Sequence, residues 1–155
     1  MNAIFRKAGS CDRSAIEELF VEMLGSIYGT ENAEGYGSDY LHKFFSGGED
    51  RIFVAEINEK VIAYISVEIK REERHFAYID DFCVTAEYRC RGLGGELLEH
   101  SEHYADNLGM SAILLHVEKS NISARKLYEK RGYTAHRTDG SRLLLVKRLK
   151  KNDDR

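Results

Sequence analysis

The chain has 155 residues, 32% of them charged, and a formal net charge of −3 at pH 7. This length suits a single domain over residues 1–150, followed by a short tail at 151–155. The near-neutral charge argues against a protein that binds nucleic acid through bulk electrostatics. No run of 18 apolar residues is present, so we expect neither a membrane span nor a membrane partner.

The cysteines form an odd and sparse set, Cys11, Cys83 and Cys90, and residues 1–9 lack the apolar stretch expected of a signal peptide. This pattern is typical of reduced thiols in the cytoplasm, which is the location we expect. His100 and His103 lie three residues apart on a predicted helix. Two solvated helix residues explain that spacing better than a metal site does, so we expect no metal.

The first third of the chain predicts a strand over 2–7 and then a helix capped by Asp12 or Ser14. A loop rich in glycine, serine and acidic residues follows at 25–37, and a short second helix is expected over 39–46. The apolar residues at helical spacing in the first helix predict a core-facing stripe: Ile16, Leu19, Phe20, Met23, Leu24 and Ile27.

The middle of the chain predicts three antiparallel strands, over 51–57, 61–71 and 75–85, because apolar and β-branched residues dominate there. Residues 58–60 suit a tight hairpin between the first two strands. The charged residues 72–74 suit a turn between the second and the third.

The last third alternates between helical and strand patterns. It predicts a helix over 94–108, a buried strand over 111–117, a helix that begins at Asn121 or Ser123 and ends at Gly132, and a closing pair of strands over 133–137 and 142–149. The whole order is βααβββαβαββ. The central strand–helix–strand unit should be parallel, and the remaining pairs antiparallel. The fold class is therefore α+β, with a mixed, mostly antiparallel sheet of about seven strands flanked by about four helices.

The segment Arg89–Gly95, with the sequence RCRGLGG, joins a predicted strand to a predicted helix. Glycines let a backbone approach a ligand closely, and a helix N-terminus presents unpaired N–H groups and a positive dipole. These features favour phosphate or pyrophosphate binding over a simple turn, and the arginines add positive charge.

Two common phosphate loops do not match this segment. A Walker loop requires Lys-Ser/Thr after its glycines, whereas Glu96 and Leu97 follow here. A dinucleotide fingerprint requires a third glycine at the position of Leu97, and it normally follows the first strand of a βαβ unit.

Two motifs resemble those of the GNAT family of acetyltransferases. Arg89-x-x-Gly92-x-Gly94 resembles the family signature Q/R-x-x-G-x-G/A. Downstream, the segment 121–133, NISARKLYEKRGY, resembles the family pattern N-x-x-A-x-x-L-Y-x-x-x-G-F/Y. The order and separation of the motifs also fit the family, and the predicted elements match a GNAT-like fold over nearly the whole chain. One departure is Ala86, where many members have proline.

The resemblance implies that acetyl-CoA is the acetyl donor. N–H groups from Cys90 to Gly95 would hold the pyrophosphate, main-chain groups of Phe82 to Val84 would pair with the pantetheine arm, and Asn121 would contact that arm. An N–H group near Phe82 would polarise the thioester carbonyl. The expected cofactor-binding residues are Phe82, Cys83, Val84, Arg89, Cys90, Arg91, Gly92, Leu93, Gly94, Gly95, Asn121 and Tyr128.

Transfer to a primary amine requires removal of a proton from the ammonium form. Asp80 and Asp81 lie inside an apolar strand pattern, where acids are costly without a purpose. Alternation would send them to opposite faces of the sheet unless a bulge intervenes. The stretch YIDDF resembles Y-L-E-D-F of polyamine-type acetyltransferases, which implies Asp80 as the base, ahead of Asp81. By the same resemblance, Tyr128 would donate a proton to the departing sulfur.

The acceptor is expected to be a small cationic amine such as a polyamine, because acidic residues cluster in the predicted loop and on the strand. Alternatives are a protein N-terminal acetyltransferase, since the stretch His116 to Asn121 resembles ribosomal-protein acetyltransferases, a coenzyme A-binding regulatory module, or an interaction protein without coenzyme. An acyl-cysteine route through Cys90 is disfavoured, because the loop would surround the pyrophosphate. The family resemblance also implies a possible homodimer.

Overall fold

A computed structural model describes residues 2–28 and 40–149. Most of the predicted loop at 25–37 and the tail at 151–155 therefore lie outside the described residues. The order of strands and α-helices predicted from the sequence is confirmed. The strands are β1 Ile4–Lys7, β2 Arg51–Ile57, β3 Lys60–Lys70, β4 Phe76–Val84, β5 Ala112–Glu118, β6 Thr134–Asp139 and β7 Arg142–Arg148. The helices are α1 Arg13–Tyr28, α2 His42–Phe45, α3 Leu93–Asn107 and α4 Ile122–Lys130, with 3-10 turns η1 Ser10–Asp12 and η2 Ala86–Tyr88.

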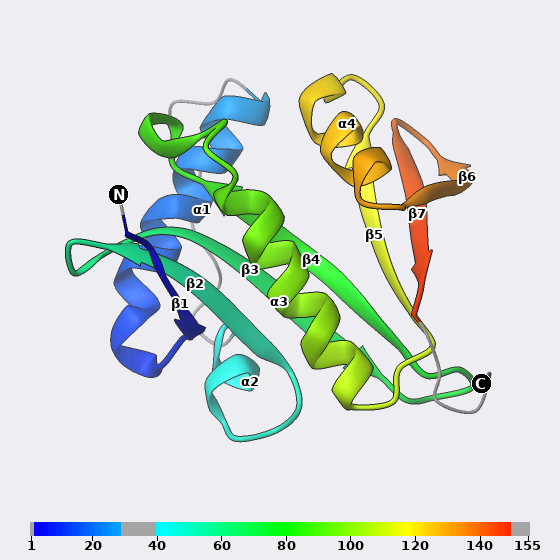
Figure 1. Ribbon diagram of the computed structural model, residues 1–155, viewed down its shortest axis with the longest axis horizontal. Coiled ribbons are helices and arrows are strands. Elements are labelled where there is room, and N and C mark those ends of the chain that lie inside the picture. The colour runs from blue at the N-terminus through cyan, green and yellow to red at the C-terminus, as the bar shows by residue number, and fades with distance from the viewer. Residues whose placement is uncertain (1, 29–39, 150–155) are drawn as a thin grey trace.

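The described strands form one sheet in the order β1-β2-β3-β4-β5-β7-β6 (Figure 1). The β4–β5 pair is parallel, as the strand–helix–strand pattern predicts, and the other neighbouring pairs are antiparallel. None of the described helices has the length and apolar composition needed to cross a membrane.

Helices cover both faces of the sheet. On one face, α3 packs over the centre of the sheet (Figure 1), and a buried cluster there includes Leu97, Leu98, Ile79 and Leu115. On the other face, Ile16 and Leu19 of α1 belong to a second buried cluster, which also contains Phe44 of α2 and Cys83 of β4. Both clusters exclude water from the strands that they cover, which is the main force that holds the layers together.

The parallel strands β4 and β5 pair only over part of their length. The last paired residues are Ile79 of β4 and Leu115 of β5. Beyond this point the two strands diverge toward the N-terminus of α3 and toward α4 (Figure 1). The remaining residues of β4, from Asp80 to Val84, stay paired with β3 on their other edge.

A bulge interrupts β4 just where it leaves β5. Ile79 is paired with Val67 and Phe82 with Ile65, so two residues, Asp80 and Asp81, stand opposite the single residue Ser66. The side chains of Ile79 and Phe82 both pack on the face covered by α3. The two acids between them are therefore directed toward the opposite face, and the alternation expected from a regular strand does not hold.

Candidate active site

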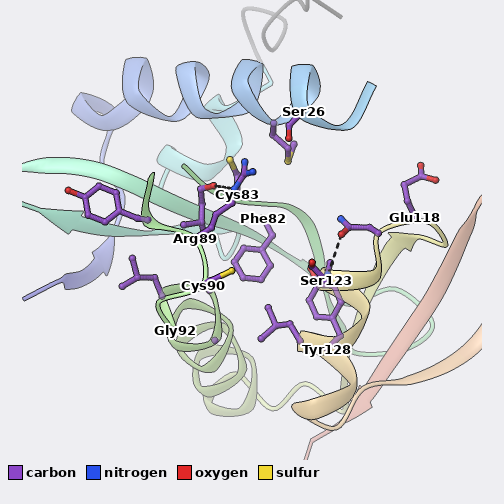
Figure 2. A pocket seen from close by; sticks show the side chains of 18 of the residues that line it. Ser26, Phe82, Cys83, Arg89, Cys90, Gly92, Glu118, Ser123 and Tyr128 are labelled. Atoms are coloured by element: carbon purple, nitrogen blue, oxygen red, sulfur yellow. Dashed lines mark hydrogen bonds between the residues drawn. The ribbon is translucent and has the colours of Figure 1, made fainter. Parts of the chain in front are cut away.

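A cavity of about 630 Å³ opens between the diverging ends of β4 and β5 (Figure 2). The end of α1, the loop between β4 and α3, and helix α4 complete its walls. The lining residues are Met23, Ser26, Phe82, Cys83, Val84, Tyr88, Arg89, Cys90, Gly92, Leu93, Gly94, Gly95, Glu118, Ser120, Asn121, Ser123, Ala124, Leu127 and Tyr128. All of the predicted cofactor-binding residues except Arg91 belong to this set.

The edge of β4 inside the cavity carries main-chain groups that β5 does not use. The N–H of Asp81 donates to Ser66 Oγ at 2.9 Å, and the N–H of Thr85 donates to the carbonyl of Ile62 at 2.9 Å, both toward β3. Since successive residues of a strand direct their N–H and C=O groups to opposite edges, those of Phe82 and Val84 are directed toward the cavity. This edge can pair with an extended ligand as if it were one more strand.

The first turn of α3 supplies a second set of donors. Gly92 precedes the helix with φ at +84°, in the left-handed region that favours glycine. Among the described residues, the N–H groups of Gly92, Leu93, Gly94 and Gly95 have no hydrogen-bond acceptor. Such a helix N-terminus, with the positive end of the helix dipole, suits a phosphate or pyrophosphate group.

The glycines of this turn also allow close packing. A Cβ atom on Gly94 would lie 3.3 Å from the Phe82 ring, and one on Gly95 would lie 3.4 Å from the Arg131 guanidinium. By contrast, a Cβ atom on Gly92 would contact nothing within 4 Å. Gly94 and Gly95 therefore bring α3 close to β4 and α4, whereas Gly92 sets the turn of the backbone.

The two arginines of the loop, Arg89 and Arg91, were expected to add positive charge for a phosphate, but both contact other residues of the protein. Arg89 donates from Nε to the carbonyl of Val84 at 2.8 Å, and its guanidinium lies 3.6 Å from Glu22 of α1. Glu22 also accepts hydrogen bonds from the Thr85 hydroxyl and the Ala86 N–H, at 2.8 and 3.0 Å. Arg89 and Glu22 thus fix the start of the loop against α1. Arg91 stacks over the Tyr88 ring, with its guanidinium carbon 5.4 Å from the ring centre.

Helix α4 contributes Asn121 and Tyr128. Asn121 caps the helix, because its side-chain oxygen accepts the N–H of Ala124 at 3.2 Å. Tyr128 is buried between Phe82 and Tyr133, with ring centres 6.3 and 5.8 Å away. Figure 2 shows the Phe82 and Tyr128 rings meeting in the cavity from β4 and α4. Burial raises the pKa of Tyr128 well above its usual value, so its hydroxyl keeps its proton at neutral pH.

The two predicted acids lie beside this cavity and do not line it. The Tyr40 hydroxyl donates a hydrogen bond to Asp80 Oδ2. Partial burial raises the pKa of Asp80, and the charge of Arg142 opposes that change. Asp81 is held at the bulge through the bond from its N–H to Ser66 Oγ. Both acids are directed to the face of the sheet that carries α1 and α2.

The two cysteines of this region differ in environment. Cys83 is buried against α1, where its thiol donates to the Leu19 carbonyl at 3.2 Å, and burial raises its pKa to about 12. A thiol held in this form is a poor nucleophile. Cys90 is exposed in the loop, with φ at +62°.

A chain of three polar side chains on the same face was not predicted from the sequence. Tyr78 Oη lies 2.6 Å from His116 Nδ1, and His116 Nε2 lies 2.8 Å from Asp139 Oδ2. Tyr78 precedes the bulge on β4, His116 follows the last residue of β5 that pairs with β4, and Asp139 ends β6. The hydrogen bond from His116, followed by that from Arg137, lowers the pKa of Asp139, so its carboxylate is charged at neutral pH.

Comparison with known proteins identifies the family. Residues 15–133 match the model of the acetyltransferase (GNAT) family. The chain belongs to the GNAT acetyltransferase family. An N-acetyltransferase of Methanocaldococcus jannaschii, MJ1530, is 34% identical over 131 residues, which cover 84% of this chain and 77% of the relative. The Bacillus subtilis N-acetyltransferase YhfO is 30% identical over 135 residues, which cover 83% of this chain and 87% of the relative.

The GNAT fold is also evident from solved structures. The PaiA N-acetyltransferase of Thermoplasma acidophilum, crystallised in complex with coenzyme A, superimposes with a TM-score of 0.79 at 20% identity, over 96% of this chain and 99% of that one. The chain is thus an acetyl-CoA-dependent N-acetyltransferase of the GNAT family. Among the described residues, no group of three His, Cys, Asp or Glu side chains is arranged to hold a metal ion.

Proposed function

We propose that the protein transfers the acetyl group of acetyl-CoA directly to a small cationic amine of the polyamine type, with both substrates bound at once. The observation that carries this proposal is the junction of the strand edge at Phe82 and Val84 with the N–H groups of Gly92–Gly95 in one cavity. That junction fits a molecule with an extended polar arm and a pyrophosphate. When bound, acetyl-CoA supplies an activated acyl group for attack by an amine.

The main-chain groups of Phe82 to Val84 hold the pantetheine arm of acetyl-CoA along β4. The N–H groups of Leu93, Gly94 and Gly95 bind its pyrophosphate at the positive end of the α3 dipole. The N–H of Phe82 or Val84 polarises the thioester carbonyl. Asn121 already uses its side-chain oxygen as the cap of α4, so its amide N–H₂ is the group left to contact the arm.

Asp80 is the proposed base. Its carboxylate is directed to the face opposite α3, and its raised pKa brings it closer to the pH at which a base accepts a proton efficiently. Asp81, held beside it by Ser66, adds a second negative charge that attracts an ammonium group. Tyr128, buried and protonated, is the proposed proton donor to the departing thiolate.

The test compares three acceptors at equal concentration by the release of free thiol from acetyl-CoA: spermidine, n-butylamine, and a short peptide with a free amino terminus. The proposal predicts the highest kcat/KM for spermidine, with a preference over n-butylamine that weakens as salt screens the acids. A preference for the peptide would replace this acceptor with a protein N-terminus, the second candidate. That candidate is supported by the resemblance of the stretch His116 to Asn121 to ribosomal-protein acetyltransferases. The homodimer implied by the family stays a prediction, which light scattering tests.

A further inference from the structure

The hydroxyl of Tyr128, the proposed proton donor, makes no hydrogen bond to any described residue. In that part of the chain no polar group fixes the hydroxyl, so the position of the ring comes from packing. The ring is buried between Phe82, with ring centres 6.3 Å apart, and Tyr133, with ring centres 5.8 Å apart in an edge-on arrangement. Edge-on aromatic pairs have a preferred geometry, so a fixed Tyr133 ring also restrains the ring of Tyr128.

Tyr133 follows the turn that ends α4 and is held at both of its ends. Its N–H donates to the carbonyl of Tyr128 at 3.0 Å, and the N–H of Gly132 donates to the carbonyl of Glu129 at 3.1 Å. With φ of Gly132 at +95°, these two bonds close the last turn of the helix. At the other end, the Tyr133 hydroxyl donates to Oε2 of Glu102 on α3 at 2.9 Å. The backbone and the hydroxyl together fix the ring.

The carboxylate of Glu102 is buried and has a second partner. Its Oε1 accepts a hydrogen bond from Nζ of Lys147 on β7 at 3.0 Å, and the same Nζ lies 5.7 Å from the centre of the Tyr133 ring. Burial, and then the negative charge of Glu102, raises the pKa of Tyr133, so its hydroxyl keeps the hydrogen that it donates. An ionised carboxylate only accepts, so the direction of the bond from Tyr133 to Glu102 is fixed.

Stability alone does not explain a buried ion pair at this place. Apolar residues of similar volume often replace such a pair without loss of stability. A hydrogen bond differs from an apolar contact because it also requires a direction. The contacts join α3, β7 and the residues that follow α4. They therefore connect the helix whose first turn is proposed to bind the pyrophosphate to the ring that is proposed to act at the sulfur.

We propose that Glu102, Tyr133 and Lys147 form a buried anchor, which positions Tyr128 for proton transfer to the sulfur of the coenzyme. In that step the O–H bond of Tyr128 breaks and an S–H bond forms, and the tyrosinate regains a proton from water before the next turnover. None of the three anchor residues lines the cavity, so each acts through Tyr128. The inference rests on the proposed function, because Tyr128 has this role only if the protein transfers an acetyl group.

The first test follows the Tyr128 ring directly, in protein without coenzyme. ¹³C NMR of protein labelled at the tyrosine Cζ atoms, with the Tyr128 signal assigned from Tyr128→Phe, reports the surroundings of this ring. Tyr133→Phe and Glu102→Met should each shift or broaden the signal. Glu99→Gln, three residues earlier on α3, breaks only exposed contacts and is the matched control. A Tyr128 signal that stays unchanged in both anchor variants would overturn the proposal without reference to activity.

The second test measures kcat and the KM for acetyl-CoA, with whichever of spermidine, n-butylamine and the peptide gives the highest kcat/KM. Tyr133→Phe and Glu102→Met should each lower kcat by about 10-fold or more, because a small displacement of a catalytic group is costly. The KM for acetyl-CoA should stay within about 2-fold. Glu102→Gln keeps an oxygen for the Tyr133 hydroxyl and should hold kcat within about 3-fold of the wild type. Equal losses in Glu102→Gln and Glu102→Met would overturn the anchor.

A double variant separates positioning from general damage. If the anchor acts only through Tyr128, Tyr133→Phe should lower kcat in the wild-type background and have no further effect in the Tyr128→Phe background. Losses that multiply would overturn the proposal, because they would show that Tyr133 acts elsewhere. Urea denaturation checks that each variant is folded under the assay conditions. Tyr133→Phe keeps both the ring and the pair of Glu102 with Lys147, so it carries the test if Glu102→Met does not fold.

Coenzyme binding separates the two levels of inference. We expect calorimetry to show equal binding of acetyl-CoA by the wild type and Tyr133→Phe, although their turnover differs. If both binding and turnover are equal, the anchor is wrong and the proposed function stands. If the folded wild type binds no acetyl-CoA, the proposed function fails, and the role of the anchor in it fails as well.

Discussion

Asp81 is fixed to Ser66 at the point where β4 carries one residue more than its partner strand. The Asp81 N–H donates to Ser66 Oγ at 2.9 Å, and Ser66 is buried on β3. The serine hydroxyl takes the place of the main-chain acceptor that a regular ladder would provide. The bulge at this contact places Asp81 on the same face as Asp80, where the amine is proposed to bind.

Ser66→Ala should therefore destabilise the protein. The substitution leaves the Asp81 N–H without its acceptor inside the sheet, and we expect a loss of about 1–3 kcal/mol in the free energy of unfolding. Urea denaturation measures the change. Ser141→Ala, in the exposed β6–β7 turn, is the control and should change stability by less than about 0.5 kcal/mol. Equal stability of the two variants would show that the bulge does not depend on the hydroxyl.

Asp80→Asn should stabilise the fold at neutral pH while it lowers activity. The folded protein raises the pKa of Asp80, mainly by burial, so folding favours the protonated carboxyl. Wild-type stability then falls as the pH rises from the ordinary carboxyl value, about 3.9, through the folded-state pKa. The neutral amide avoids this cost. Thermal melts at pH 7 and pH 3 should show a higher Tm for the variant at pH 7 and a smaller difference at pH 3. A variant that is less stable at pH 7 would contradict the assigned direction.

Tyr128→Phe should reduce kcat by about 100-fold or more and leave acetyl-CoA binding intact, because it removes only the proposed proton donor. The phenylalanine ring keeps the packing against Phe82 and Tyr133. Steady-state kinetics with spermidine measure kcat, and calorimetry measures coenzyme binding. Tyr104→Phe, whose hydroxyl bonds the Glu49 carbonyl outside the cavity, is the control. Wild-type turnover by the Tyr128 variant would remove this residue from the mechanism.

Asp12→Asn should loosen the start of α1, the helix whose Glu22 holds the start of the loop between β4 and α3. Arg6 binds both oxygens of Asp12, at 2.8 and 2.9 Å, and this pairing is the main cause of the lowered pKa of Asp12. The stabilisation is present above pH about 3.9 and is lost as the pH falls through the lower folded-state pKa. At pH 7 we expect a loss of about 1–3 kcal/mol, since the pair is partly exposed.

The control for this prediction is Glu17→Gln, which breaks only the exposed pair with Arg13 on α1. Its cost should be about 0.5 kcal/mol or less. Urea denaturation at pH 7 and pH 3 follows both variants. A cost of Asp12→Asn that is as large at pH 3 as at pH 7 would rule out the charge of Asp12 as the cause.

Much of the fold follows from local patterns in the sequence. The strand over 51–57 and the strong helical period after Gly94 are local properties, and both elements are found where they were expected. The final strand pair is shifted by one or two residues, and the turn η2 before Arg89 was not predicted. Ends of elements depend on contacts such as those of Glu22 with Thr85 and Ala86, which no local pattern contains.

The candidate site was predictable where residues are contiguous and unpredictable where they are not. The composition of the loop 89–95 predicts phosphate binding. At the bulge, Asp81 contacts Ser66, which lies 15 residues away in the sequence. The chain Tyr78–His116–Asp139 joins residues that are 38 and 23 positions apart. Tyr78 and His116 lie within segments that resemble family motifs, but no sequence signal marks Asp139. Only the pairing of β4, β5, β7 and β6 brings these three together.

The most direct measurement is calorimetry of acetyl-CoA binding to the wild type and to Gly92→Asp. The new carboxylate would stand at the N-terminus of α3 and repel a pyrophosphate. Gly109→Asp is the matched control, because Gly109 has a similar φ of +79° at the other end of α3. We predict micromolar binding by the wild type and by Gly109→Asp, and its loss in Gly92→Asp. No binding by folded wild-type protein, or equal binding by Gly92→Asp, would contradict the assignment of this cavity to the coenzyme.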